Sequence, residues 1–126
     1  MEYRALSGEL RELSERECFT LLSSVDHGQL AITQKALPAI VPVRLWLIDE
    51  ELIVSSLLGT AVPLSVDHVV ALQAGPLGEG LVNDWSVEVR GFLKRWSDST
   101  EAIEQDGVPR ERFRVTADHV RGWSVS

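Results

Sequence analysis

The stretch from 38 to 60, PAIVPVRLWLIDEELIVSSLLGT, constrains the fold of this chain more than any other segment. Its first half is apolar at every second position from Val41 to Leu47. Side chains alternate between the two faces of a strand, so these positions define one apolar face. A polar turn, 49–51, then leads into a second apolar run. The segment therefore predicts two antiparallel strands joined by a tight turn.

The opposite face of this hairpin is more polar and contains Arg44 beside Trp46. Its second strand loses apolar character at Ser55-Ser56, and Gly59-Thr60 follows shortly afterwards. Hydroxyl groups and a glycine just past a buried strand suit the binding of an anion at the rim of a barrel. An ordinary hairpin with a solvated arginine accounts for the same residues, so both interpretations stay open at this point.

The 126 residues carry a formal net charge of -7, with 44% apolar and 25% charged side chains. These values are typical of a globular protein, and we expect a single domain over 1–126. The acidic balance argues against a nucleic acid or an anionic membrane as partner, since both attract basic surfaces. No apolar run approaches the roughly 18 residues that span a bilayer, and no signal peptide is apparent. A single cysteine excludes an internal disulfide, so the cytoplasm is the expected compartment.

Ser14 and Glu17 have the spacing of a capping box, in which each side chain bonds the backbone amide of the other residue. Apolar residues then recur at helical spacing from Cys18 onward, which predicts a helix over 15–24. Cys18 lies on that apolar stripe without a basic neighbour on its face, so we expect a core thiol and not a nucleophile. Gly28 is expected to end the helix in the left-handed conformation.

The rest of the chain alternates short apolar segments with turns. We expect strands over 29–34, 68–74, 85–96 and 111–120, a glycine-rich loop over 75–80 and a short helix around 100–105. Short strands, tight turns and too few helices for β-α-β units favour a closed antiparallel barrel. The three histidines are far apart in the sequence and have no paired cysteine, so we expect no metal site.

The segment Asn83–Gly91, NDWSVEVRG, resembles the WSV-x-VRG strand of the pyridoxamine 5'-phosphate oxidase-like family, the FMN-binding split barrels. The similarity is strongest to the short forms common in actinobacteria. Gly28–Ala31 resembles the G-x-L-A first strand of the family, and Pro38–Val43 resembles its P-x-x-x-PV second strand. The opening helix and the arginine-rich final strand also fit, so the shared order extends over about 110 residues.

This resemblance implies a mainly β fold, a six-stranded antiparallel split barrel with Greek-key connections. It implies a homodimer formed through a sheet face, with two FMN sites in the grooves between subunits. The implied cofactor-binding residues fall in three groups: Pro42, Val43, Arg44 and Leu45 along the ring; Ser55, Ser56, Gly59 and Thr60 toward the phosphate or ribityl chain; and Gln73, Trp85 and Ser86 at the border of the groove.

Two departures from the family pattern bear on the cofactor. The family has a lysine where this chain has Ala61, and loss of a charge-assisted bond costs about 1.5–3 kcal/mol. Arg44 and Arg90 are the candidate replacements. The acidic FE-x-D block is replaced by Leu72–Gly75, in which Gln73 could still bond a flavin edge. The site is therefore weak for FMN, altered toward the deazaflavin F420 or haem, or vestigial.

Three functions stay open on this basis. The first is a flavin-dependent oxidoreductase of unknown substrate, in which the cofactor carries the chemistry, because no residue is an obvious general acid or base. The second is a carrier or sensor module for flavin, F420 or haem. The third is a dimeric split barrel that has lost its cofactor. Trp46 and Trp96 are candidates for the dimer interface or for covering a ring.

Overall fold

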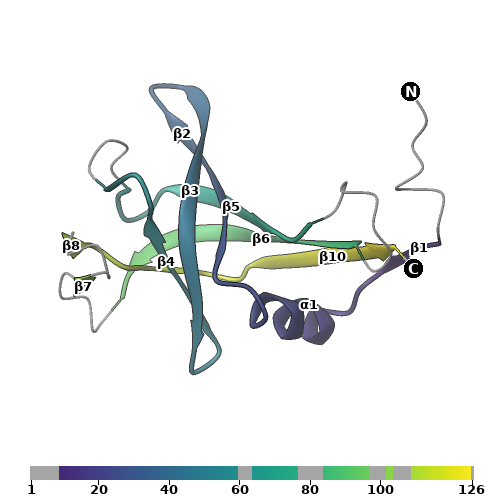
Figure 1. Ribbon diagram of the computed structural model, residues 1–126. Coiled ribbons are helices and arrows are strands. Elements are labelled where there is room, and N and C mark those ends of the chain that lie inside the picture. The colour runs from purple at the N-terminus through teal and green to yellow at the C-terminus, as the bar shows by residue number, and fades with distance from the viewer. Residues whose placement is uncertain (1–8, 60–63, 77–83, 97–101, 104–108, 126) are drawn as a thin grey trace.

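The computed structural model describes residues 9–59, 64–76, 84–96, 102–103 and 109–125 (Figure 1). These residues form one helix, α1 (Glu15–Leu22), and ten strands. The strands are β1 (Leu10–Glu12), β2 (His27–Gln34), β3 (Leu37–Ile48), β4 (Glu51–Ser56), β5 (Val69–Ala74), β6 (Asp84–Arg95), β7 (Ala102–Ile103), β8 (Pro109–Arg110), β9 (Phe113–Val115) and β10 (His119–Val125).

Six strands close into an antiparallel barrel in the order β6-β5-β2-β3-β4-β9, with β9 pairing back onto β6. β6 is long enough to serve two neighbours. Its first seven residues, Asp84–Arg90, pair with β10, and its last three pair with β9. β10 in turn pairs with β1 outside the barrel. The barrel wall is therefore split along β6, which confirms the six-stranded split barrel.

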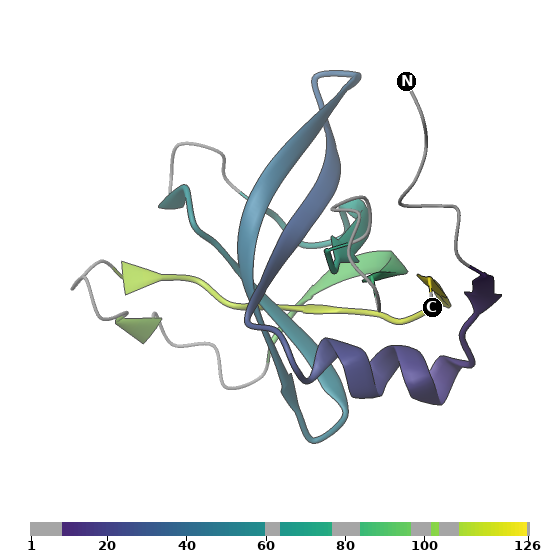
Figure 2. The ribbon, with the colours of Figure 1, turned by 45° about the vertical axis from the view of Figure 1, so that its right-hand side comes forward.

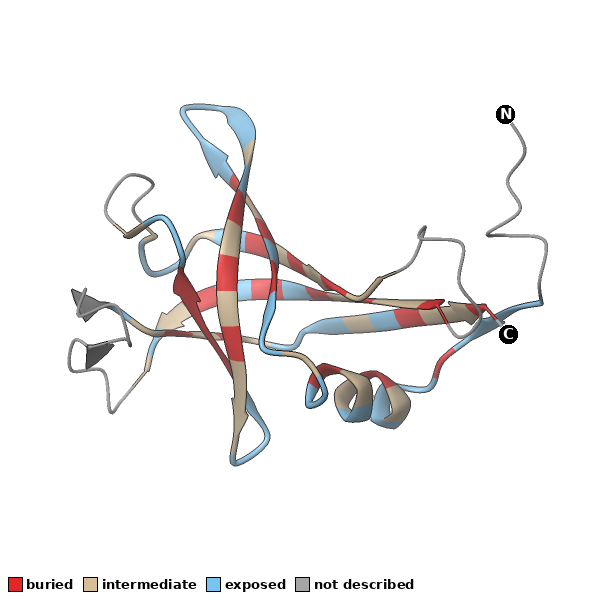
Figure 3. Ribbon diagram, in the orientation of Figure 1, coloured by how far each residue is buried: buried red, intermediate tan, exposed pale blue. Residues whose placement is uncertain are grey.

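Buried residues recur at alternate positions along several strands (Figure 3), and their apolar side chains form the core of the barrel. On β3, Val41, Val43 and Leu45 are at most 1% exposed, whereas Ile40 on the opposite face is 60% exposed. This confirms the apolar face expected for the first strand of the hairpin. β4 differs, because every residue from Leu52 to Ser56 is buried, including those on the outer face.

Both hairpins that contain β3 turn within two residues. Lys35 and Ala36 have φ of 52° and 64°, and Asp49 and Glu50 have φ of 50° and 67°. Positive φ at both central residues is the mark of a type I′ turn, which matches the twist of paired strands. Neither turn contains the glycine or asparagine that usually accepts this conformation, so the long ladders on either side enforce it.

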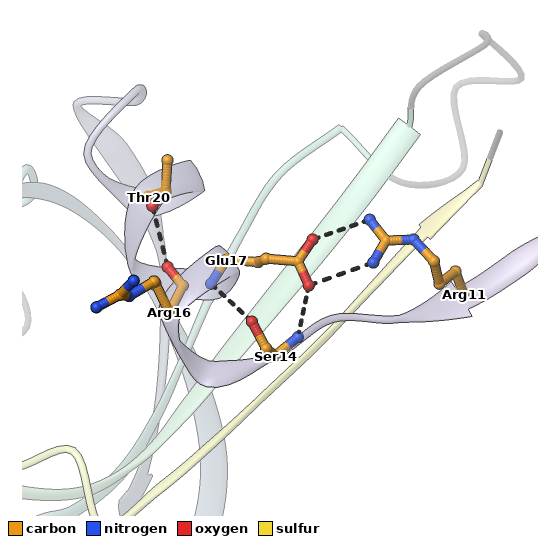
Figure 4. A network of polar contacts seen from close by, with 5 residues as sticks. All are labelled: Arg11, Ser14, Arg16, Glu17 and Thr20. Atoms are coloured by element: carbon orange, nitrogen blue, oxygen red, sulfur yellow. Dashed lines mark hydrogen bonds and ion pairs between the residues drawn. The ribbon is translucent and has the colours of Figure 1, made fainter.

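Helix α1 runs alongside β10 (Figures 1 and 2), with Cys18 and Leu22 fully buried on its inner face. The capping box is present: Glu17 N donates to Ser14 Oγ at 3.1 Å, and Ser14 N donates to Glu17 Oε1 at 3.0 Å (Figure 4). Arg11 adds two bonds to the same carboxylate, at 3.2 and 3.0 Å. Cys18 is a free, buried thiol in the core, as expected.

The expectation for Gly28 is wrong. The helix ends at Leu22 with Ser23 as its cap, and Gly28 lies inside β2, opposite Val43. A Cβ at this position would lie 2.7 Å from the carbonyl oxygen of Gln73 on β5. The glycine is needed because two strands approach closely, and not because the backbone is left-handed.

Two further expectations near the C-terminal end are also wrong. The strand expected over 111–120 is two strands, because Thr116 N donates to Phe92 O at 2.9 Å and Asp118 N donates to Arg90 O at 3.1 Å. These bonds bend the chain where it passes Gly91, so β9 and β10 pair with different parts of β6. In the helix expected around 100–105, the described residues Ala102–Ile103 form β7 instead, since they pair with β8.

Candidate functional site

The candidate site lies on the outer face of the sheet, where polar side chains from several strands fall into rows. In one row Gln29 pairs with both Pro42 and Gln73, and Gln73 pairs with Glu88. The row therefore crosses β3, β2, β5 and β6. Since side chains on paired residues point to the same face, Pro42 and Gln73 lie on one surface although they are distant in the sequence.

A second row runs parallel to the first. Arg44 pairs with His27 on β2 and with Ser55 on β4. His27 Nδ1 lies 3.0 Å from Asp26 Oδ1, and this hydrogen bond is the main cause that lowers the pKa of Asp26 below its ordinary value. The charge of Arg44 adds a smaller attraction in the same direction. Arg44 and Ser55, both predicted site residues, are thus neighbours.

A pocket of about 430 Å³ adjoins the two rows and contains Gln73, Trp85 and His27 in its wall. Gln73 Nε2 donates to Ser86 Oγ at 3.2 Å and to Gly75 O at 3.4 Å. The three residues predicted at the border of the groove, Gln73, Trp85 and Ser86, are therefore brought together by β5 and the start of β6. The sequence analysis missed His27, because its place beside Gln73 depends on strand pairing.

Arg112 is the functional candidate that sequence reasoning missed entirely. Its Cζ lies 4.5 Å from the ring centre of Trp46 and 5.9 Å from that of Trp96. Its Nε is buried and has no hydrogen-bond partner within the described parts of the chain, and the same is true of Ser55 Oγ. Val54 pairs with Phe113, so the neighbouring positions Ser55 and Arg112 come together where β4 meets β9.

The other predicted residues divide into three groups. Val43 and Leu45 point into the core, so only their backbone could reach a ligand, and Leu45 N already donates to Asp26 O at 3.0 Å. Ser56 is also buried, and its Oγ accepts a bond from Leu58 N at 3.0 Å. Gly59 has a φ of 58° and is partly exposed, while Thr60 and Ala61 lie outside the described residues.

Arg90, one candidate replacement for the missing lysine, is engaged elsewhere. Its Nε lies 3.0 Å from Glu88 Oε1, and its partners across the sheet are Ala71 and His119. Arg44 pairs with Ser55 in the register of β3 and β4, whereas Arg90 lies on β6, so Arg44 is the better placed of the two for an anion at this end of β4.

A larger hollow, of about 620 Å³, is present between α1 and the β3–β4 turn, lined by residues such as Phe19 and Leu47. It contains none of the predicted site residues, so we place the candidate site at the smaller pocket and its two rows. In the part of the chain that the structure describes, no helix is long and apolar enough to cross a membrane, and no group of three metal-ligating side chains is found.

The family model described as pyridoxamine 5'-phosphate oxidase matches residues 14–122. The chain belongs to this family. A relative of similar sequence is the uncharacterized protein Rv0080 of Mycobacterium tuberculosis, 38% identical over 118 residues, a match that covers 89% of this chain and 78% of the relative. The resemblance noted on the Asn83–Gly91 strand is thereby confirmed.

Solved structures share the pyridoxamine 5'-phosphate oxidase-like fold along nearly their whole length. An FAD-binding protein from Mycobacterium smegmatis matches with a TM-score of 0.71 and 22% identity, covering 94% of this chain and 100% of that one. An FAD-binding protein from Mesorhizobium loti matches with a TM-score of 0.69 and 24% identity, covering 95% and 99%. At these identities the likeness shows the shared split barrel.

Proposed function

We propose that this protein binds a flavin on the outer face of its barrel and uses it in an oxidoreductase reaction. The observation that carries the proposal is the placement of Gln73 and Trp85 in the wall of one pocket, with Ser86 hydrogen-bonded to Gln73, beside the Arg44–Ser55 pair. Family membership supports it, as do two structural neighbours that are FAD-binding proteins.

The residues present fit such a group. The pocket has the volume of a typical small-molecule site, and the amide of Gln73, the indole of Trp85 and the imidazole of His27 line it. Gln73 and Ser86 would bond the polar edge of the ring, and Trp85 would exclude water from its face. At the other end of the site, Arg44 and the unpaired Ser55 Oγ suit the phosphate. A bound flavin would supply hydride or electron transfer, which these side chains do not provide.

We also propose a homodimer, formed through the outer sheet face. Val69 pairs with Phe92, and the two are 67% and 41% exposed. Ile40, 60% exposed, continues the same face across Ala31 and Ala71. Such an apolar patch on an acidic chain favours burial against a second copy. Because the patch borders the polar rows, a partner subunit would cover part of the flavin site.

The direct test is the absorption spectrum of the purified protein, followed by titration with FMN, FAD, riboflavin, F420 and haemin. We expect the two characteristic flavin bands, or quenching of flavin fluorescence on titration, and a weaker response to F420 and haemin. A Soret band, or binding of F420 alone, would replace flavin by haem or F420 in a carrier or sensor role. Absence of binding to all five would favour a scaffold that has lost its cofactor.

A variant pair locates the site. Gln73→Leu removes the amide from the pocket wall at similar volume, and we expect the affinity for the isoalloxazine ring to fall by about one decade, the loss of one hydrogen bond to a buried partner. Thr33→Leu adds an apolar side chain at an exposed position of β2 outside the pocket and serves as the control. Equal affinity in both variants would place the flavin elsewhere.

A further inference from the structure

Arg112 is held in a way that a structural role alone does not explain. Its guanidinium packs against Trp46 at 4.5 Å and lies within 5.9 Å of Trp96, so its plane and direction are fixed. Its Nε is nevertheless buried, and no acceptor for it is found among the residues that the structure describes. A buried charged donor without an acceptor is costly, and native proteins keep one where something else supplies the acceptor.

Ser55 presents the same feature at the neighbouring position. The residue is fully buried, and none of the described residues offers its Oγ a hydrogen-bond partner. It lies on the outer face of β4, directly opposite Arg44 on one side and next to Arg112 on the other. A serine in the middle of a sheet wall would be replaced at little cost by alanine or valine if its hydroxyl had no function.

The surroundings of these two groups are cationic, although the chain as a whole has a net charge of -7. Arg114 pairs with Ile53, the outer-face residue that precedes Ser55 by two positions. Arg44, Arg112 and Arg114 therefore fall on the outer face around one end of β4. Arginines that share one face with a buried hydroxyl give this end of β4 the chemistry of a phosphate-binding site.

We propose that Arg112, positioned by Trp46 and Trp96, binds a phosphate together with Arg44 and Ser55. The inference rests on the proposed flavin function, and the phosphate is that of the flavin. Arg112 supplies the cation that the sequence lacks at Ala61. The ring would then lie toward Gln73 and Trp85, since the Arg44–His27 pair connects the two ends of the site.

The test compares FMN with riboflavin, which has the same ring and no phosphate, by calorimetric titration at low and high salt. The wild-type protein is expected to prefer FMN. Arg112→Met should weaken FMN binding ten- to a hundredfold, the change expected for one charge-assisted contact, and leave riboflavin within about twofold. Arg112→Lys keeps the charge and loses the planar guanidinium, so its affinity for FMN should lie between those of the wild type and Arg112→Met. The FMN preference should shrink as salt rises.

Two controls separate a binding role from a structural one. Arg90→Met removes an arginine that is paired with Glu88 on the same outer face, and it should leave the FMN-to-riboflavin ratio unchanged. Ser55→Ala should lower FMN affinity severalfold while the ligand-free protein melts at the same or a higher temperature, because an unpaired buried hydroxyl is removed. Retained riboflavin binding by each variant reports that the ring site is folded.

The outcomes are distinct. Equal affinity of the wild type for FMN and riboflavin, or an FMN preference that survives Arg112→Met, overturns the phosphate site and leaves the flavin function intact. Failure of both flavins to bind the wild-type protein overturns the proposed function and this inference with it. A parallel loss of FMN and riboflavin affinity in Arg112→Met would make Arg112 a structural residue.

Discussion

Gly91 leaves less room for a methyl group than the other described glycines. A Cβ there would lie 1.8 Å from the carbonyl oxygen of Thr116 and 2.4 Å from its Oγ1. The same hydroxyl accepts a bond from Phe92 N at 2.8 Å and donates to Asp118 Oδ2 at 3.1 Å, so Thr116 cannot move without losing both. We expect Gly91→Ala to destabilise the protein by about 3 kcal/mol, the upper range for overpacking.

Urea unfolding measures this effect, with the midpoint moving and the slope unchanged. Gly59→Ala is the matched control: it adds the same methyl group at a position where such crowding is absent, since no atom of the described residues beyond its chain neighbours lies within 4 Å. Its φ of 58° alone should cost about 1 kcal/mol. A loss in Gly91→Ala no greater than that in Gly59→Ala would mean that the backbone around Thr116 relaxes freely.

At the scale of elements, the turn between β2 and β3 imposes a conformation that its residues disfavour. Ala36 has a φ of 64°, in the left-handed region, and its partner in the turn, Lys35, has a φ of 52°. Ala36→Gly removes the steric cost that a Cβ carries at positive φ in the folded state. Glycine also increases the conformational entropy of the unfolded chain, which cancels part of this gain. We expect a net stabilisation of about 0.5–1 kcal/mol.

The thermal midpoint checks this prediction, and Ala39→Gly supplies the contrast. Ala39 lies within β3 opposite Ile32, where glycine should destabilise by about 0.5–1 kcal/mol. The two identical substitutions are thus expected to move the midpoint in opposite directions. A decrease in both would show that the hairpin turn is not a type I′ turn in solution.

The start of α1 makes stability depend on pH. The hydrogen bonds from Arg11 and, after them, the Ser14 amide lower the pKa of Glu17 from 4.5 to about 2 (Figure 4). A carboxylate whose pKa is lowered on folding stabilises above its unfolded pKa, and the contribution is lost as the pH falls from 4.5 toward 2. Glu17→Gln should therefore destabilise the protein near neutral pH, and the difference from wild type should vanish in acid.

Melting temperatures of both proteins across this pH range test the prediction. Glu15→Gln changes the same charge in the first turn outside the network of Arg11 and Ser14, and its difference from wild type should vary less with pH. Ser14→Ala, which removes the cap itself, should cost about 1 kcal/mol near neutral pH. A pH-independent difference for Glu17→Gln would mean that Arg11 does not pair with Glu17 in solution.

On the scale of the whole molecule, the apolar patch on the outer face predicts self-association. Val69→Glu places a charge at a 67% exposed position opposite Phe92 and should convert a dimer into a monomer of about 14.0 kDa. Leu10→Glu makes the same kind of change at a 55% exposed position on β1, away from the patch, and should leave the dimer intact. Light scattering at micromolar concentration measures both.

If the flavin site includes the partner subunit, Val69→Glu should also weaken flavin binding although no pocket residue changes. The flavin titration can be repeated on this variant and on Leu10→Glu. A wild-type protein that is monomeric would remove the composite site, and so would a monomeric Val69→Glu variant with full affinity.

Local patterns in the sequence were sufficient for most single elements. The alternation of apolar residues in β3 predicted the buried face that contains Val41, and the spacing of Ser14 and Glu17 predicted the start of α1. Both predictions succeed because strand and helix periods depend only on residues close together in the sequence. The motif at Asn83–Gly91, together with its order among the other motifs, identified the family and with it the split barrel.

Pairing between strands that are distant in the sequence determined the closure of the barrel and the composition of the candidate site. The barrel closes because β9 pairs with both β4 and β6. The chain bends at Thr116, between β9 and β10, and this bend requires that Gly91 has no side chain. Nothing local in the sequence distinguishes Gly28 as a close contact between strands from a helix-ending glycine. Likewise, the alternation around Phe113 shows that Arg112 faces outward, but only closure of the barrel brings it to Ser55 and Trp46. The sequence therefore determines the periodic elements, and the tertiary structure determines which of their outward faces meet in one site, since strand partners lie far apart along the chain.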